Sequence, residues 1–397
     1  MRSSAAPGLA LRLTAVAAAI ASLLAVVSGV TGAGAPHREL AALALPPLLA
    51  LVLAAWYAHR RLLVPALVAL LCFLAAAVGT LNRPLHVALA ALAFAAAVVL
   101  AALTLRGERV ARGSLRDYVT LTKPRIMTLL LLTGACGMVV GARGFPPLGR
   151  FGAMMLGLAL ACGGASALNH LLDRDIDRLM GSRTEGRPVA TGRLSPPRAL
   201  EFGLALSACS FVLLASAVNV LTAVLALVGN LFYVVVYTGF LKRRGPRNIV
   251  LGGAAGAVPP LVGYAAATGN LALPALWLFL IVFLWTPPHF WALALLLRDH
   301  YAAANVPMLP VVSGDAVTIR RIIGYTVALV AFTAAPFLAG TFGWTYLVGA
   351  LVLGVVFLVL ALRLRAGSER RRAALVFHYS LLYLALLFVA AALDAAL

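Results

Sequence analysis

Long apolar segments, separated by short polar and basic connections, follow one another along the whole chain. Each is about 20 residues long, which is the length that an α-helix needs to cross the hydrocarbon core of a bilayer. The pattern predicts thirteen such helices, and we therefore expect an all-α polytopic membrane protein. The expected spans are 13–31, 40–57, 62–80, 85–105, 124–141, 151–172, 199–216, 219–240, 249–268, 273–297, 322–340, 343–362 and 374–393.

The composition supports the same class of protein. Of the 397 residues, 63% are hydrophobic and 11% are charged, whereas a soluble domain carries roughly 25% charged residues. So much apolar surface cannot be buried in a soluble core, and no repeat, polar tract or dense cysteine pattern indicates a fibrous, disordered or disulfide-rich protein. Each of the four cysteines lies alone inside a predicted span, where a small buried side chain is the ordinary role. They are Cys72, Cys136, Cys162 and Cys209.

The basic residues orient the predicted helices. The chain has 32 Lys and Arg against 12 Asp and Glu, a net charge of +20, and 28 of the 32 lie in the N-terminal tail and every second connection. Basic connections face the cytoplasm, so we expect the N-terminus and the long basic loops there, in a cell (inner) membrane, with the first span uncleaved. The charge then reflects topology and contact with anionic lipid, and it requires no nucleic acid.

The connection 106–123, RGERVARGSLRDYVTLTK, is the most polar one in the first third of the chain and predicts a domain boundary. Residues 1–115 would form a four-helix membrane block, for which the pattern indicates no role. Residues 116–397 would form a nine-helix domain, which contains nearly all the unusual polar residues.

Three acidic residues lie within five positions, at Asp173, Asp175 and Asp177. Asn169, Asp173 and Asp177 are spaced four apart, so on a helix they form one stripe, and Asp175 points away from it. Carboxylates at membrane depth are costly and usually functional, and two carboxylates with an amide suit Mg²⁺. The alternative is a solvated helix end, in which Asp and Arg form surface ion pairs of little energetic value.

Basic side chains follow the stripe. Arg183 and Arg187 come directly after it, and Lys242 follows Tyr233 and Tyr237 one cytoplasmic connection later. Carboxylate-bound Mg²⁺ on one side and guanidinium or ammonium groups on the other are what a diphosphate leaving group needs. A transporter with polar residues along a path is the competing interpretation, and the gathering of these residues at one face disfavours it.

The combined pattern N-x-x-x-D-x-x-x-D and R-T-x-x-R-P resembles the first motif of the UbiA-type intramembrane prenyltransferases, which are nine-helix enzymes that join an isoprenoid diphosphate to an acceptor. It comprises Asn169, Asp173, Asp177, Arg183, Thr184, Arg187 and Pro188. The resemblance covers about residues 116–395. Further segments resemble the protohaem IX farnesyltransferase (haem o synthase) branch, namely LTKPRIM (121–127), YTGFLKRR (237–244), GAVPPLVGYAAATG (256–269), TPPHFWALAL (286–295) and ANVPMLPVV (304–312).

The resemblance implies an activity and its residues. Farnesyl diphosphate and haem b (protohaem IX) would react at a haem vinyl group with Mg²⁺ as cofactor, giving haem o for haem–copper oxidase assembly. A quinone-like aromatic acceptor is the alternative. The implied catalytic residues are Asn169, Asp173, Asp177, Lys242 and Tyr237; the implied diphosphate ligands are Arg183, Arg187 and Lys242; and the implied metal ligands are Asn169, Asp173, Asp177 and Asp299.

The chain departs from the family pattern at one acidic position. The acid that usually precedes the tyrosine of the second cytoplasmic motif is replaced by His300, and Asp299 stands one position earlier. Aromatic faces can stabilise an allylic cation, and Tyr233, Tyr237, Tyr264 and Trp285 are the candidates. His289, near the middle of a predicted span, is a candidate haem ligand or base.

The N-terminal block carries three histidines, His37, His59 and His86. The segments around His59 and His86 resemble half of a haem a synthase. This implies that the block could hold haem or pass it to a haem a synthase partner. The alternative is a docking or purely structural role.

Overall fold

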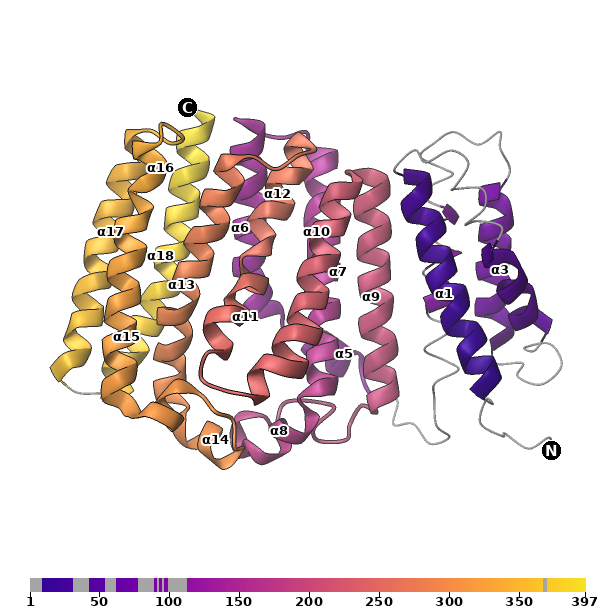
Figure 1. Cartoon of the computed structure of the whole chain (residues 1–397), viewed down its shortest axis with the longest axis horizontal. Helices are drawn as coiled ribbons and strands as arrows, with labels where there is room; N and C mark the ends of the chain where they lie inside the picture. Colours follow the sequence, from indigo (N-terminus) through magenta and orange to yellow (C-terminus); the bar gives the residue numbers. More distant parts are fainter. Residues whose placement is uncertain are drawn as a thin grey trace.

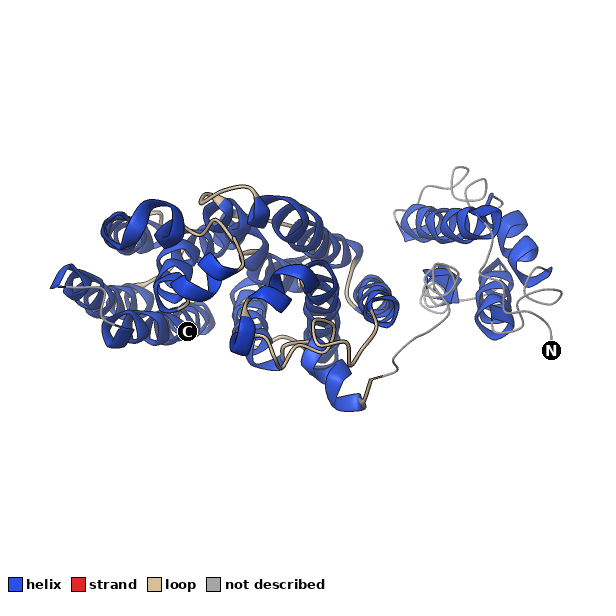
Figure 2. Cartoon of the chain, turned by 90° about the horizontal axis from the view of Figure 1, so that it is seen from below, coloured by secondary structure: helices blue, strands red, loops and turns tan. Residues whose placement is uncertain are grey.

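A computed structural model describes residues 9–30, 43–53, 62–77, 89–90, 93–94, 96–98, 113–366 and 370–397. Every regular element in these ranges is a helix, as Figure 2 shows. Nine helices in these ranges are long and apolar enough to cross a membrane. The predicted all-α multi-pass architecture is thereby confirmed, whereas the total of thirteen spans is not. The nine are 124–142, 148–172, 196–217, 220–243, 248–268, 273–296, 309–338, 344–366 and 370–396.

The longer helices described in the N-terminal block are α1 (Leu9–Val30), a helical segment over Leu43–Leu53 and α3 (Leu63–Ala77). They share an apolar core, to which Ala15, Leu51 and Ala66 contribute. The ring of Phe94 lies edge-on to Phe211, with centroids 6.5 Å apart, so this block contacts the larger bundle. The three histidines of the block, and most of the fourth predicted span, lie outside the described residues.

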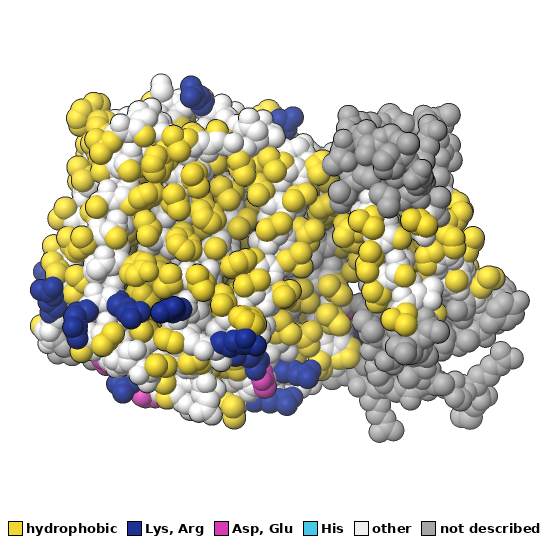
Figure 3. Space-filling model, viewed as in Figure 1, with side chains coloured by type: hydrophobic (Ala, Val, Ile, Leu, Met, Phe, Trp, Pro, Cys, Tyr) yellow, Lys and Arg dark blue, Asp and Glu magenta, His cyan; other side chains and the backbone are white. Residues whose placement is uncertain are grey.

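The larger bundle, from α5 to α18 in Figure 1, contains the acidic stripe, the basic residues after it and the segments that resemble the prenyltransferases. Its α-helices are α5 (Leu115–Leu121), α6 (Pro124–Ala142), α7 (Leu148–Leu172), α8 (Arg174–Leu179), α9 (Pro196–Ala217), α10 (Val220–Leu231), α11 (Asn248–Gly256), α12 (Val258–Thr268), α13 (Leu273–Leu296), α14 (Arg298–Ala303), α15 (Leu309–Thr333), α16 (Ala335–Leu338), α17 (Trp344–Arg363) and α18 (Arg370–Ala396). Between them lie the short helices η2 (Gly181–Arg183), η3 (Phe232–Phe240), η4 (Leu241–Arg243) and η5 (Leu364–Ala366). The short helices α8 and α14 close one end of the bundle, and basic side chains gather towards that end (Figure 3).

Glycines allow the helices that carry the site to approach closely, as small residues do in membrane bundles. A Cβ atom added to Gly263 of α12 would lie 1.8 Å from the carbonyl oxygen of Gly134 on α6. On α7, a Cβ atom at Gly157 would lie 2.4 Å from the side chain of Leu214 on α9. The positions of α6 and α7, whose ends reach the acidic stripe, therefore depend on glycines that leave room for a neighbouring backbone in one case and for a leucine side chain in the other.

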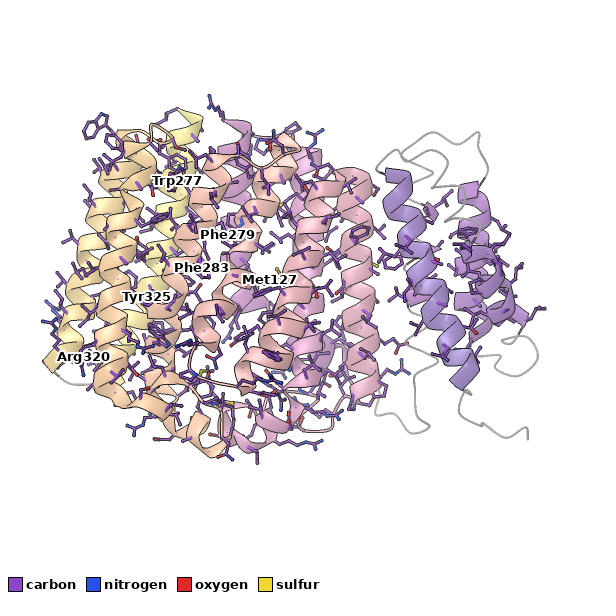
Figure 4. All side chains as sticks on the ribbon, in the orientation of Figure 1. Met127, Trp277, Phe279, Phe283, Arg320 and Tyr325 are labelled. Carbon is purple, nitrogen blue, oxygen red and sulfur yellow. The ribbon has the colours of Figure 1, made fainter. Side chains whose placement is uncertain are left out.

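Aromatic contacts fix α13 against α15. Trp277 lies 5.5 Å from Phe332, and Trp291 lies 5.2 Å edge-on to Tyr325, measured between ring centroids. Figure 4 shows Trp277 near the end of α13 that is farther from α8 and α14. The helix that carries His289 is thus anchored near both ends.

One span begins earlier than predicted. The expected range was 322–340, but α15 begins at Leu309 and continues through Gly314, whose φ of 76° interrupts the helical backbone. Glycine tolerates a positive φ because it has no Cβ atom. Polar residues from Ser313 to Arg321 lower the hydropathy of this first part, which is why the apolar pattern placed its start too late.

Candidate active site

The acidic stripe forms where α7 passes into α8. Backbone hydrogen bonds run from Asp173 N to Asn169 O and from Asp177 N to Asp173 O, both 2.8 Å, so helical spacing persists across the junction. Asn169, Asp173 and Asp177 are 3%, 1% and 2% exposed, whereas Asp175 is exposed. The predicted stripe, with Asp175 pointing away from it, is confirmed.

Each buried carboxylate has one oxygen held by the protein and one without a partner. Oδ2 of Asp173 accepts from Lys242 Nζ at 2.6 Å and from Asn169 Nδ2 at 2.8 Å. Oδ1 of Asp177 accepts from Arg187 Nη1 at 2.5 Å. Oδ1 of Asp173 and Oδ2 of Asp177 are buried and accept no hydrogen bond from the part of the chain that the structure describes. A buried polar atom without a partner is costly, and two such carboxylate oxygens are suitable ligands for a divalent cation.

Lys123 is a site residue that the sequence analysis did not single out. Its Nζ donates to Asn169 Oδ1 at 2.6 Å, and its backbone has a φ of 50° between α5 and α6. Burial, reinforced by the charge of Arg187, lowers the pKa of Lys123 to about 7. One signal for Lys123 was present in the sequence, since it directly precedes Pro124. Proline keeps the preceding residue out of the right-handed helical region, so a break between two helices was to be expected at this lysine.

Lys242 is positioned by a π-helix, η3, in which the backbone bonds close over five residues. Such helices are rare and often occur at functional sites. Tyr233 and Tyr237 stack within it, with ring centroids 5.6 Å apart and an interplanar angle of 30°. Gly252 of α11 makes room for Tyr237, since a Cβ atom there would lie 2.3 Å from the ring. Stacked tyrosines and Lys242 therefore reach the stripe from one continuous segment.

A loop after α8 positions Arg187. Oγ1 of Thr184 donates to Asp177 O at 2.5 Å, and the backbone N–H of Arg187 donates to Thr184 O at 2.8 Å. This turn places the guanidinium of Arg187 on the carboxylate of Asp177. Burial raises the pKa of Asp177, and the hydrogen bond from Arg187 opposes that shift. Arg183, in η2, is exposed at the edge of the site.

A second arginine, not singled out in the sequence, anchors that loop to α5. Nε of Arg193 donates to Asp117 Oδ1 at 3.0 Å, and its Nη2 donates to Gly186 O at 2.8 Å. Asp117 also forms a capping box with Ser114 at the start of α5. Hydrogen bonds from Ser114 lower the pKa of Asp117. The polar connection before α6, where the sequence predicts a domain boundary, is thus also part of the site's framework.

Asp175 forms a separate, exposed ion pair. Arg243 donates to both of its oxygens, at 2.6 and 2.7 Å, and also to Leu172 O at 2.7 Å. The hydrogen bond from Arg243 lowers the pKa of Asp175 to about 2. This pair therefore matches the surface ion pair that was the alternative interpretation, at this one position of the acidic segment.

Asp299 does not join the two buried carboxylates in a cluster. It lies exposed on α14, and within the described ranges no group of three or more His, Cys, Asp or Glu side chains is placed to hold a metal ion. The ring of His300 lies 3.0 Å from the carbonyl oxygen of Met180, so it ties α14 to the end of α8. Tyr301 lies near the site: burial raises its pKa, and the charges of Arg187 and Asp173 act on it.

His289 lies on the α18 side of α13. Its ring stacks between Trp285 and Phe377, at centroid distances of 4.3 and 4.8 Å, and its Nδ1 lies 2.7 Å from Ser380 Oγ. These contacts are with α13 itself and α18. Tyr264 contacts Gly141 at the end of α6 opposite Lys123, so it lies away from the acidic stripe.

The fold and the site define a multi-pass helical membrane protein that holds two buried carboxylates among basic groups at one end of its bundle. The chain belongs to the UbiA prenyltransferase family, whose model matches residues 130–389.

Several relatives are identical to this chain at about half of the matched positions. The chain is 51% identical over 280 residues to the "Protoheme IX farnesyltransferase" of Roseiflexus sp. (strain RS-1), a match covering 70% of this chain and 52% of that protein. It is 52% identical over 282 residues to the protein of the same name from Symbiobacterium thermophilum, covering 70% of this chain and 94% of that protein. The chain thus spans about half the length of the first relative and nearly all of the second.

Solved structures show the same fold at low identity. A UbiA homolog from Archaeoglobus fulgidus bound to DMAPP and Mg²⁺ has a TM-score of 0.53 at 19% identity, over 69% of this chain and 98% of that one. A digeranylgeranylglyceryl phosphate synthase has a TM-score of 0.59 at 18% identity, over 71% of this chain and 98% of that one.

Proposed function

We propose that the protein transfers the farnesyl group of farnesyl diphosphate to a vinyl group of haem b, giving haem o for haem–copper oxidase assembly. The observation that carries the proposal is the pair of bare carboxylate oxygens, on Asp173 and Asp177, surrounded by Lys123, Lys242 and Arg187. Identities of about 50% to proteins named protoheme IX farnesyltransferase support the choice of substrates.

The cofactor of this reaction would be Mg²⁺, which the residues present fit. Oδ1 of Asp173 and Oδ2 of Asp177 would hold it, because both are buried acceptors without a donor. Asn169 would assist through Asp173, since its own amide oxygen accepts from Lys123. When bound, Mg²⁺ supplies positive charge to the diphosphate oxygens. Asp299 as a ligand of a further ion rests on the sequence alone, where it stands one position before the acid of the family pattern.

The basic residues would stabilise the leaving group. As the C–O bond of farnesyl diphosphate breaks, negative charge develops on the diphosphate. Lys123, Lys242 and Arg187 already lie on the stripe and would share their hydrogen bonds with it, while Arg183 would reach it from the edge. Preorganised groups of this kind are typically the largest single contribution to catalysis.

The stacked tyrosines would stabilise the farnesyl cation. Tyr233 and Tyr237 belong to η3, which leads directly into Lys242, so a cation formed beside the diphosphate would lie close to their rings. Each aromatic face can contribute about 0.5–2 kcal/mol to such a cation. The terminal vinyl carbon of haem b would then form a C–C bond with the cation. Water would add to the resulting carbocation and lose a proton, which leaves a hydroxyethylfarnesyl side chain.

His289 is the proposed haem-binding residue. Ser380 has one hydroxyl proton, which it donates to Phe377 O at 2.6 Å, so its oxygen accepts from Nδ1–H of His289. That hydrogen bond selects the tautomer whose Nε2 carries a lone pair. A free Nε2 is the atom that an iron ligand or a general base requires.

The location and the N-terminal block complete the proposal. We place the protein in the cell membrane with the N-terminus and the end that carries α8 and α14 in the cytoplasm, which the basic side chains at that end support (Figure 3). A haem-handling role for residues 1–115, and a haem a synthase as partner, are supported by the sequence resemblance alone. A purified fragment 1–115 without haem absorbance would contradict that role.

The test uses membranes that contain the whole chain, incubated with haem b, farnesyl diphosphate and Mg²⁺, and the extracted haems are separated by mass. We expect a haem heavier by one hydroxyethylfarnesyl modification, absent after chelation of Mg²⁺. Asp177→Asn should abolish it, whereas Asp175→Asn, at an exposed carboxylate two positions away, should retain it. Diphosphate release with a quinone precursor and no new haem would move the acceptor to the quinone-like class. No release with either acceptor would contradict the proposal.

A further inference from the structure

The side chain of Thr238 lies at the centre of the hydrogen bonds that hold the stripe. It belongs to the π-helix η3 and is 0% exposed. Its Oγ1 donates to Tyr233 O, five residues earlier, at 2.9 Å, and accepts from Asn169 Nδ2 at 3.1 Å. The hydroxyl therefore joins the segment of the stacked tyrosines to the first residue of the stripe.

The single proton of that hydroxyl favours one orientation of the Asn169 amide, and Asp173 and Lys123 favour the same one. Because Thr238 gives its proton to Tyr233 O, it can only accept from Asn169, so the NH₂ group of Asn169 must face it. The same NH₂ group then donates to Asp173 Oδ2, and the amide oxygen is turned to Lys123. A reversed amide would place its oxygen against the Asp173 carboxylate and its NH₂ group against the Lys123 ammonium.

Asn169 in this orientation acts together with Lys242 to leave one oxygen of Asp173 free. Asn169 and Lys242 both donate to Oδ2, so Oδ1 is the oxygen left without a partner. Groups that hydrogen-bond to metal ligands orient them, and their loss typically lowers metal affinity 10–100-fold.

We propose that Thr238 is a positioning residue for the metal site: through Asn169 it holds Asp173 so that Oδ1 faces a divalent cation. This inference rests on the proposed function, and it gives a role to an uncharged residue of the segment 237–244 to which the sequence pattern assigned none. The π-helix is part of it, because the wide turn brings the hydroxyl onto the carbonyl of Tyr233 while Tyr233 and Tyr237 stay stacked.

The experiment measures binding of Mn²⁺ by electron paramagnetic resonance, with the unreactive analogue farnesyl thiodiphosphate present, so that no turnover is needed. Thr238→Val keeps the shape of the side chain and removes the hydroxyl. Thr238→Ala also removes the hydroxyl but puts no methyl group in its place. The test can therefore be made with either variant if the other does not fold. Thr238→Ser restores the hydroxyl. The matched control is Thr326→Val on α15, since Thr326 is also 0% exposed and its hydroxyl bonds only to Ile322 O of its own helix, at 2.8 Å.

We expect Thr238→Val and Thr238→Ala to weaken Mn²⁺ binding about tenfold or more, and Thr238→Ser and Thr326→Val to bind as the parent does. Mn²⁺ affinity equal to the parent's in Thr238→Val or Thr238→Ala overturns the inference and leaves the proposed function standing. Equal weakening in Thr326→Val would also overturn it, because loss of any buried hydroxyl would then suffice. If the parent itself binds no Mn²⁺ with the analogue, the proposed metal site fails, and the inference fails with it.

Discussion

Lys242 and Arg243 are adjacent residues whose ion pairs differ in burial, and this gives a sharp comparison. Lys242 pairs with Asp173, and the two side chains are 11% and 1% exposed. Arg243 pairs with Asp175, and those side chains are 37% and 59% exposed. Replacing either basic residue with methionine removes one positive charge and leaves one carboxylate without its partner. The energetic result should depend on where that carboxylate lies.

The expected magnitudes follow from burial. Removing one partner of a buried pair costs about 3–5 kcal/mol, because the other charge stays buried and uncompensated. An exposed pair contributes about 0–1 kcal/mol. At about 2 °C per kcal/mol for a domain of this size, Lys242→Met should lower Tm by roughly 6–10 °C and Arg243→Met by at most about 2 °C. We expect the Lys242→Met value near the lower end, since Asn169 still donates to Asp173.

The assay is thermal unfolding in one detergent at a fixed scan rate, with farnesyl transfer measured on the same samples. A double variant, Lys242→Met with Asp173→Asn, removes both charges and should recover most of the lost Tm. It should still not transfer the farnesyl group, because the site lacks the charges of both Lys242 and Asp173. If Lys242→Met lowers Tm no more than Arg243→Met does, the buried pair does not have the energetic weight assigned to it.

Three further predictions concern the surroundings of the stripe. Gly252→Ala should slow farnesyl transfer about tenfold, because the new Cβ atom would meet Tyr237 and overpacking costs roughly 1–3 kcal/mol. Gly256→Ala on the same helix should not slow it, because no described atom lies within 4 Å of the Cβ position there. Equal rates in the two variants would refute the reasoning. The pKa of Asp117 is lowered in the folded protein, so its ionised carboxylate raises the free energy of unfolding. That stabilisation is present above the unfolded pKa of about 3.9 and is lost as pH falls through the folded value. Asp117→Asn should therefore lower Tm at pH 7, by an amount that shrinks below about pH 4; a difference that does not change with pH would contradict this. Mn²⁺ should bind more tightly when farnesyl thiodiphosphate is present, because Lys242 and Arg187 already balance the two buried carboxylates and the analogue brings further negative charge and oxygen ligands. Equal affinities without the analogue would argue against that balance of charge.

The sequence predicted the parts of the site that depend on local spacing. The stripe followed from residues four apart, and the basic side chains after it followed from their order along the chain. Lys123 and Thr238 could not be found in this way, because their hydrogen bonds to Asn169 span 46 and 69 positions. A π-helix has no signature in a pattern read at 3.6 residues per turn, so the hydrogen bond from Thr238 Oγ1 to Tyr233 O, five residues earlier, had to come from the structure.

The site draws its residues from segments that only the folded bundle brings together. Asn169 and Asp173 lie at the end of α7, Lys123 lies before α6, and Lys242 follows the π-helix. Each carboxylate is held through one oxygen by a basic group, which lowers the cost of burying it, while the other oxygen is left bare. Had both oxygens been satisfied by the protein, the stripe would be a structural ion-pair cluster; had neither been, two buried carboxylates would repel each other without compensation. This half-satisfied arrangement distinguishes a cation-binding site from a stabilising network. Lys242 and Asn169 hold Oδ2 of Asp173 and leave Oδ1 bare, and in our proposal Thr238 supports Asn169 in that role.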